Sequence, residues 1–415
     1  MKNIIFITGI GDLDTDVSLS GYARRFAKAL DKNDDEKNFF YTISLEKKKF
    51  SSSDPQDCEI ATIRRKLPDD KTGGEVLYKL FEYSYQDEFV KSFNEKNIFI
   101  KSLRLSWGVF KMTPVFLRAA FGARGLNGKQ KRQSLYFFFI LILLSTFVFF
   151  LMPSLLALVF DNIEPVKNCF IKYFPADLAS NVTIRGVLHD VLKKFDSFSH
   201  FSVAFASGIA ILFPMFQQQL SITASRFLCV HYYLKYGENK ARVTGELANL
   251  IEKISESENN YEGFEIHAYS FGSIIAIDTL FPKTPNQVDK RVSSEITDLV
   301  TIGCGFDFIR VYYPYYFQHR PKGMMNIRSW YNVNSQLDVL SSNFRNDSNE
   351  ENGDETLTPG NLKPVNVPYE VTDPNSVGVF DNLLLTNFKT HRMYWDDDIE
   401  GLSFFTNYLN KKYTN

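Results

Sequence analysis

Cysteine, histidine and net charge are all scarce in this chain of 415 residues. Its four cysteines are far apart and contain no C-x-x-C pair: Cys58, Cys169, Cys229 and Cys304. That spacing predicts neither a zinc site nor a disulfide framework, and it is typical of a reducing compartment. The formal net charge of -1 argues against a general nucleic-acid-binding protein, so we expect no nucleic-acid partner.

Apolar sequence, in contrast, is abundant and is concentrated in the middle of the chain. Residues 135–160 contain no charged side chain and exceed the roughly 20 residues that span a bilayer. A weaker apolar run covers 198–216. We therefore predict a membrane insert over 134–220 with two transmembrane helices at 135–160 and 198–216, preceded by a basic juxtamembrane segment at 108–133. The basic flanks predict an integral membrane protein whose remaining domain lies on the cytoplasmic side.

The sequence on either side of this insert has the pattern of one α/β domain, made of residues 1–107 and 221–415. A continuously apolar run at Asn3–Thr8 predicts a strand that is buried on both faces. Leu299–Ile302 predicts another buried strand, and Trp330–Asn334 predicts a further strand. Amphipathic helix patterns alternate with them, which predicts a mostly parallel sheet flanked by helices and interrupted by the transmembrane hairpin.

Two stretches of the first half have weaker patterns. Residues 47–74 are polar and irregular, and we expect a surface excursion there. Residues 76–93 have apolar spacing that we interpret as a helix.

The pattern that most constrains function runs from Phe264 to Leu280. A short apolar run ends at Ala268, and an apolar helix pattern begins after Ser270. Small residues two positions before and two after a serine, at a strand-to-helix turn, are the pattern of a nucleophile elbow. Ala268 stands where that pattern has glycine, and an ordinary strand-to-helix turn is the alternative interpretation.

A nucleophilic serine needs a base and a carboxylate that holds the base. Only His319 and His391 follow Ser270. In the nucleophile-elbow fold the histidine comes last, after the acid, which favours His391. For the acid, Asp338 follows the predicted strand at 330–334, and Asp307 is the alternative.

These motifs together resemble the α/β-hydrolase superfamily, particularly its lipase- and esterase-like members. The resemblance covers about residues 1–107 and 241–415 and implies Ser270 as nucleophile, His391 as base and Asp338 as acid. It also implies an oxyanion hole formed by the backbone N–H of Phe271 and by a donor near Ile10 and Gly11. No metal or organic cofactor is implied.

The sequence thus predicts a membrane-anchored serine hydrolase that cleaves an ester through an acyl-enzyme intermediate. The expected partners are the lipid bilayer and a lipid or acyl-ester substrate, and a homo-oligomer is compatible with this interpretation. One alternative is a non-enzymatic or weakly active membrane effector or scaffold. Another is an acyltransferase that uses the same three residues.

Overall fold

A computed structural model describes the chain in separate stretches. These are residues 1–10, 18–33, 39–50, 57–68, 73–85, 107–108, 110–111, 113–114, 117–118, 142, 229–235, 237–258, 261–283, 294–318, 320, 327–338, 340–345, 353, 362–370, 391, 393–395 and 403–414. The chain divides into two compact units. The first comprises Met1–Val90, Val115–Phe137 and Val230–Asn415, the second Lys91–Pro114 and Phe138–Cys229. All the elements named below belong to the first unit.

One eight-stranded sheet forms the centre of the first unit, with the strand order β2-β3-β4-β1-β5-β6-β7-β8. Its strands are β1 (Lys2–Ile7), β2 (Phe40–Lys48), β3 (Cys58–Lys66), β4 (Glu75–Tyr83), β5 (Phe264–Tyr269), β6 (Ile296–Ile302), β7 (Ser329–Asn334) and β8 (Val365–Pro368). Neighbours from β4 to β8 are parallel. The pairs β2–β3 and β3–β4 are antiparallel. All six residues of β5 are buried, as expected for a central parallel strand covered on both faces.

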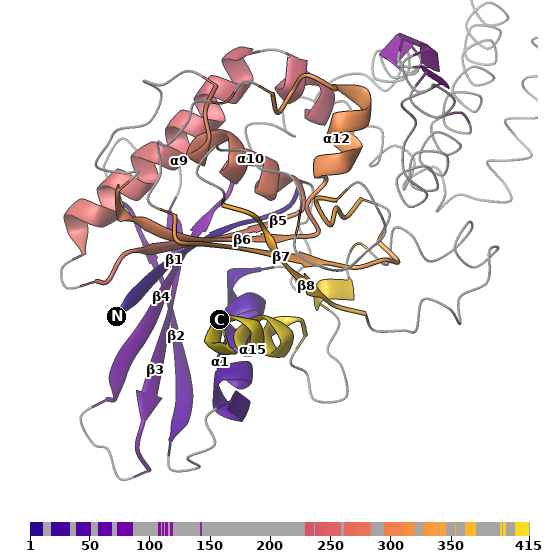
Figure 1. Ribbon diagram of the computed structural model, residues 1–415. Helices are drawn as coiled ribbons and strands as arrows, with labels where there is room; N and C mark the ends of the chain where they lie inside the picture. Colours follow the sequence, from indigo (N-terminus) through magenta and orange to yellow (C-terminus); the bar gives the residue numbers. More distant parts are fainter. Residues whose placement is uncertain are drawn as a thin grey trace, which may run out of the picture. The chain divides into compact units, whose positions relative to one another are not determined.

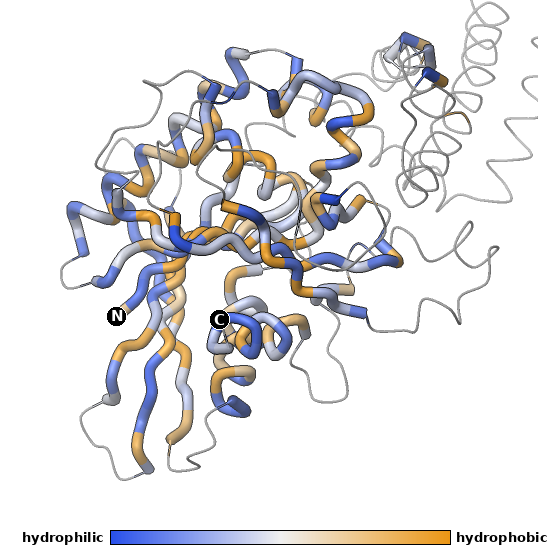
Figure 2. Tube along the Cα trace, viewed as in Figure 1, coloured by the Kyte–Doolittle hydropathy of each residue, from blue (hydrophilic) through white to orange (hydrophobic). Residues whose placement is uncertain are grey.

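Helices cover both faces of this sheet (Figure 1). On one face lie α9 (Gly237–Ser257), α10 (Phe271–Leu280) and α12 (Phe306–Tyr312). On the other lie α1 (Leu19–Asn33) and α15 (Phe405–Thr414), which pack against each other. Figure 2 shows hydrophilic segments alternating with hydrophobic ones along α9, whereas all ten residues of α10 are buried. The strand and the helix on either side of Ser270 are therefore both fully buried.

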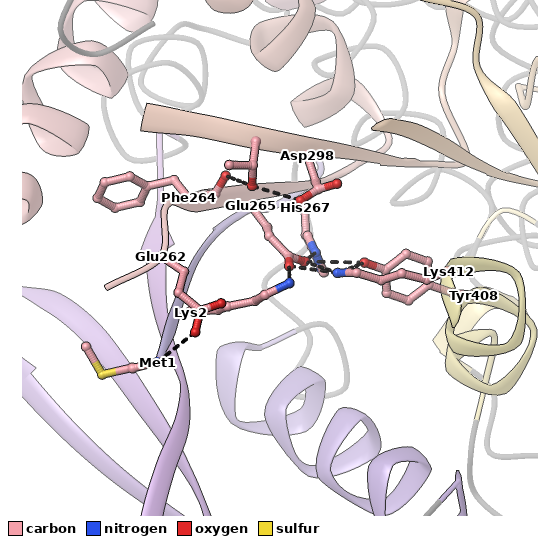
Figure 3. Close-up of polar contacts among 10 residues, drawn as sticks. Met1, Lys2, Glu262, Phe264, Glu265, His267, Asp298, Tyr408 and Lys412 are labelled. Atoms are coloured by element: carbon pink, nitrogen blue, oxygen red, sulfur yellow. Dashed lines mark hydrogen bonds and ion pairs between the residues drawn. The ribbon is translucent and has the colours of Figure 1, made fainter. Parts of the chain in front are cut away.

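The C-terminal helix α15 is fixed to the sheet by a buried polar cluster around Glu265 of β5 (Figure 3). Lys412 Nζ lies 2.7 Å from both carboxylate oxygens of Glu265. Lys2 Nζ of β1 lies 3.2 Å from Glu265 Oε1, and Tyr408 of α15 donates a hydrogen bond of 3.4 Å to Oε2. One carboxylate thus joins two strands and the last helix of the chain.

His267, two residues along the same strand, extends this cluster towards α1. Its Nε2 lies 3.2 Å from Glu265 Oε2, and its Nδ1 is hydrogen-bonded to the hydroxyl of Tyr22. Burial lowers the pKa of His267, so the ring is neutral at pH 7, donating from Nε2 and accepting at Nδ1. Burial alone would raise the pKa of Glu265, but the His267 hydrogen bond and the charges of Lys412 and Lys2 hold it well below its usual range.

The predicted transmembrane hairpin requires correction. Among the residues that the structure describes, no helix is long and apolar enough to cross a membrane. The longest helix named above, α9, has 21 residues but carries charged side chains along its length, and the fully apolar α10 has only ten residues. At 1.5 Å per residue, ten residues reach about half of a bilayer core.

The expected fold class, the membrane localisation and the membrane anchor are therefore wrong as stated. The ranges 135–160 and 198–216 lie outside the described residues, apart from Ile142. The described fold is the mixed sheet with its covering helices, without a membrane-crossing helix.

Two secondary-structure expectations in the first half of the chain are also wrong. Within the expected polar excursion at 47–74 lies β3, which pairs with both β2 and β4. The start of the helix expected over 76–93 is instead β4, paired with β1 and β3. The apolar residues of β4 fit either spacing, and only pairing with β1 on one side and β3 on the other selects the strand.

We predict that Lys412→Met lowers the free energy of unfolding by about 2 kcal/mol at pH 7, because it leaves the Glu265 carboxylate buried with one cation fewer. Lys411→Met is the matched control, since Lys411 is exposed on the same helix, and we expect a change within about 0.5 kcal/mol. Urea unfolding measures both variants. Because the pKa of Glu265 is depressed, the difference should persist above about pH 4.5 and fade as the pH falls through the folded-state value. Equal losses in the two variants would contradict the prediction.

Candidate active site

Ser270 lies at the junction of β5 and α10, with a backbone conformation that serine seldom adopts. Its φ is 55° and its ψ is -124°. A positive φ in a residue other than glycine costs about 1–3 kcal/mol and persists only where the surroundings impose it. Here the Ser270 N–H donates to Ile302 O of β6 at 2.7 Å, and Ser270 O accepts from the Ser273 N–H at 3.1 Å. The turn is thus tied to the next strand and to the first turn of the helix.

The small residue at position 272 is required by the approach of α10 to β1. A Cβ on Gly272 would lie 2.6 Å from Thr8 O and 2.8 Å from Ile7 O. These are backbone atoms of a central strand and its exit, so they cannot move aside as a side chain could. Glycine therefore allows the start of α10 to lie directly against the end of β1.

The other end of α10 is held by a buried ion cluster at Asp278. Arg320 Nη2 lies 2.6 Å and Lys240 Nζ 2.9 Å from Asp278 Oδ1. The Tyr233 hydroxyl donates to Oδ2 at 3.1 Å. Burial would raise the pKa of Asp278, but the charges of Arg320 and Lys240 lower it below its usual range. The carboxylate is therefore ionised and anchors the helix that begins directly after Ser270.

The structure brings Ser270, His391 and Asp338 together in a continuous hydrogen-bonded line. His391 Nε2 lies 2.7 Å from Ser270 Oγ, and His391 Nδ1 lies 2.8 Å from Asp338 Oδ2. An ionised carboxylate can only accept, so Nδ1 carries the proton and Nε2 is the acceptor that faces the serine hydroxyl. This arrangement of hydroxyl, imidazole and carboxylate is the geometry of a Ser-His-Asp triad.

The three side chains of the triad differ in burial: the acid is enclosed, and the base and the nucleophile are partly exposed. The Asp338 side chain is fully buried, whereas that of His391 is 13% exposed, and Ser270 is half-buried. Asp338 Oδ1 accepts the N–H of Leu340 at 3.0 Å, which fixes one edge of the carboxylate. The carboxylate is thus held inside the protein, and the hydroxyl and imidazole are accessible from outside.

The alternative acid and the second serine of the elbow are bonded to other partners than His391. Asp307 on α12 is hydrogen-bonded to Ser342 and paired with Arg310 at 3.1 Å, not with His391. Ser273, the other serine of the elbow, is buried and donates to Ala268 O at 2.7 Å. His319 lies outside the described residues.

Gly303, directly after β6, leaves room for the triad. Its φ is +58°, and a Cβ there would lie 2.8 Å from the Tyr394 ring, 3.2 Å from His391 Cε1 and 3.4 Å from Asp338 Oδ2. Its N–H donates to Val333 O of β7 at 2.9 Å. A side chain at this position would both strain the backbone and displace the imidazole.

The expected oxyanion-hole donors are only partly described. Phe271 is the first residue of α10, and the first-turn N–H groups of a helix have no partner within the helix. Ile10 lies two residues beyond Thr8, at the same sheet edge as Ser270, because β1 and β5 are parallel neighbours. Gly11 lies outside the described residues. The positive end of the helix dipole also favours a negative charge beside the Phe271 N–H.

Two tyrosines contact the triad, and the sequence patterns do not reveal their role. The Tyr394 hydroxyl donates to Asp338 Oδ2 at 2.9 Å, from the short 3₁₀-helix η4 (Met393–Trp395). The Tyr269 hydroxyl donates to the backbone oxygen of His391 at 2.6 Å. Tyr394 lies three residues after the base, and Tyr269 lies one residue before the nucleophile. These positions are the only sequence signal, and they are not specific.

In the described part of the chain, no group of three or more His, Cys, Asp or Glu side chains could hold a metal ion. Comparisons with protein-family models, curated proteins and solved structures return no match for this chain. The function must therefore be inferred from the site itself.

We predict that Gly303→Ala lowers the free energy of unfolding by about 1–3 kcal/mol, because alanine is strained at positive φ and its Cβ overlaps the Tyr394 ring. Gly305→Ala is the control. Gly305 has a φ of -80°, and its nearest neighbour to an added Cβ is Leu340 O at 3.8 Å. We expect that variant to lie within about 0.5 kcal/mol of wild type in denaturant unfolding. An unchanged Gly303→Ala protein would refute the close packing around the triad.

Proposed function

We propose that the protein is a serine hydrolase that cleaves an ester through an acyl-enzyme intermediate. The observation that carries the proposal is the line from Ser270 Oγ through His391 to the buried Asp338, with separations of 2.7 and 2.8 Å. The strained backbone at Ser270 and the parallel run from β4 to β8 support a relationship to the α/β-hydrolase superfamily.

In the first half of the reaction, His391 Nε2 takes the proton of Ser270 Oγ as the oxygen attacks the carbonyl carbon of the ester. The electron pair of the carbonyl moves to its oxygen, which becomes an oxyanion and accepts the Phe271 N–H. Collapse of this intermediate breaks the bond to the alcohol. The departing oxygen takes the proton from His391, leaving the acyl group on Ser270.

In the second half, water replaces the alcohol and the same groups act in the same order. His391 removes a proton from water as the water oxygen attacks the acyl carbon. The second oxyanion collapses, Ser270 Oγ regains its proton from His391, and the carboxylic acid leaves. Asp338 stays ionised throughout and stabilises the imidazolium that forms twice in each cycle.

The substrate class follows from what the three residues can activate. A serine hydroxyl whose proton is taken by a neutral imidazole attacks acyl carbons, and an ester has a better leaving group than an amide. Ser270 is half-buried beside a helix start, and an acyl ester can present its carbonyl oxygen to the Phe271 N–H there. We therefore propose an acyl ester as the substrate.

The first test is Ser270→Ala. It should abolish covalent labelling by a fluorophosphonate probe and lower turnover of a water-soluble acyl ester at least 10³-fold, because only the attacking oxygen is removed. Ser273→Ala is the matched control and should keep both within a few-fold of wild type, since Ser273 bonds to Ala268 O. A wild-type protein that neither reacts with the probe nor turns over esters would favour a non-enzymatic role. Labelling that survives Ser270→Ala would assign another nucleophile.

The second test separates the two candidate acids. Asp338→Asn should lower kcat/KM about 10³- to 10⁴-fold, because an amide can donate to His391 Nδ1 and so favours the wrong tautomer. Asp307→Asn should lower it less than tenfold, since Asp307 contacts Arg310 and Ser342. Steady-state ester hydrolysis measures both. The reverse ranking would remove Asp338 from the triad.

A further inference from the structure

Besides the hydrogen bond from His391, the Asp338 carboxylate accepts one from a backbone N–H and one from a tyrosine hydroxyl. Its Oδ1 accepts the N–H of Leu340 at 3.0 Å. Its Oδ2 accepts both His391 Nδ1 at 2.8 Å and the hydroxyl of Tyr394 at 2.9 Å. With Oδ1 fixed by the backbone and one lone pair of Oδ2 occupied by Tyr394, the remaining lone pair of Oδ2 is directed at the imidazole.

The Tyr394 hydroxyl is suited to this task because it can only be a donor towards the carboxylate. Tyr394 is completely buried. Burial raises the pKa of Tyr394, and the neighbouring charge of Asp338 raises it further, so the hydroxyl keeps its proton. A hydrogen bond to an ionised acceptor is about twice as strong as one between neutral groups.

Tyr269 performs the equivalent task for the imidazole. Its ring stacks on that of His391, with centroids 5.3 Å apart and planes 21° from parallel. Its hydroxyl donates to His391 O at 2.6 Å, so the same side chain holds the ring face and the backbone of residue 391. Tyr269 itself is the last residue of the buried strand β5 and is fully enclosed.

The two tyrosines also support each other. Their rings meet edge to face, with centroids 6.4 Å apart. The Tyr269 and Trp395 rings meet in the same way, with centroids 5.0 Å apart. Tyr269 precedes Ser270 directly, and Tyr394 follows His391 by three residues. The contacts therefore tie the segment that carries the base to the strand that carries the nucleophile.

We propose that Tyr394 and Tyr269 are positioning residues for the Ser270 site. Tyr394 orients the Asp338 carboxylate and Tyr269 orients His391, so that Nε2 faces Ser270 Oγ before any substrate binds. The inference rests on the proposed hydrolase function and adds to it the residues that preorganise the base.

The test compares Tyr394→Phe and Tyr269→Phe with Tyr261→Phe. The Tyr261 hydroxyl donates to the carboxylate of Glu295 at 2.9 Å, just before β5 and at the opposite end of that strand from Ser270. The control thus also loses a tyrosine–carboxylate hydrogen bond, away from the triad. We expect kcat for a soluble acyl ester to fall about 10- to 100-fold in the first two variants. KM should change less than about threefold, and the control should keep its kcat within about twofold.

A spectroscopic readout separates this inference from the function on which it rests. In protein labelled with ¹⁵N-histidine, the proton on His391 Nδ1 should give a downfield resonance that Tyr394→Phe and Tyr269→Phe weaken or remove and Tyr261→Phe retains. If wild type shows this resonance but has no esterase activity, the proposed function fails while the positioning stands. If either triad-side variant keeps both the resonance and the kcat of the control, that tyrosine has no positioning role.

Discussion

The structure depends on the strained turn at Ser270, where a fully buried strand passes into a fully buried helix without a loop. A φ of 55° at serine costs free energy, and three neighbours impose it. Ile302 of β6 accepts the Ser270 N–H, β1 presses against Gly272, and the Asp278 cluster anchors the far end of α10. None of these contacts involves the hydroxyl. The scaffold therefore holds the conformation of the turn and leaves Oγ available for chemistry.

Strand β5 supports both halves of the candidate site because its two faces have different partners. Gly272, just beyond it, meets β1 on the side of α10, whereas Glu265, His267 and Tyr269 point to the side of α1 and α15. The Glu265 cluster fixes α15, and Tyr269 holds the backbone of His391, which precedes that helix in the chain. A single buried strand thus positions the nucleophile directly and the base through the segment that folds back on it.

Three buried carboxylates of this interior are each held by named partners. Glu265 has Lys2 and Lys412, Asp278 has Arg320 and Lys240, and Asp338 has the hydrogen bonds of Tyr394 and Leu340 besides His391. Ion pairs of this kind add little net stability compared with apolar packing, but removal of one partner is costly because the other stays buried. They act mainly to fix which segments meet, which is what a three-residue site assembled from distant parts of the chain requires.

Features that depend on neighbouring residues can be predicted from the sequence alone. The elbow could be predicted because the strand, the small residues and the helix lie within a few positions of Ser270, and chain order pointed to Asp338 and His391. Tertiary structure decided what depends on distant pairing. His391 meets Ser270 across 121 residues, and Asp338 rather than Asp307 meets His391 because of how β7 and α12 are placed. The strand identity of β3 and β4 and the roles of Tyr269 and Tyr394 have the same cause. Apolar spacing reports that a segment is buried, but not which other segment, or which environment, buries it.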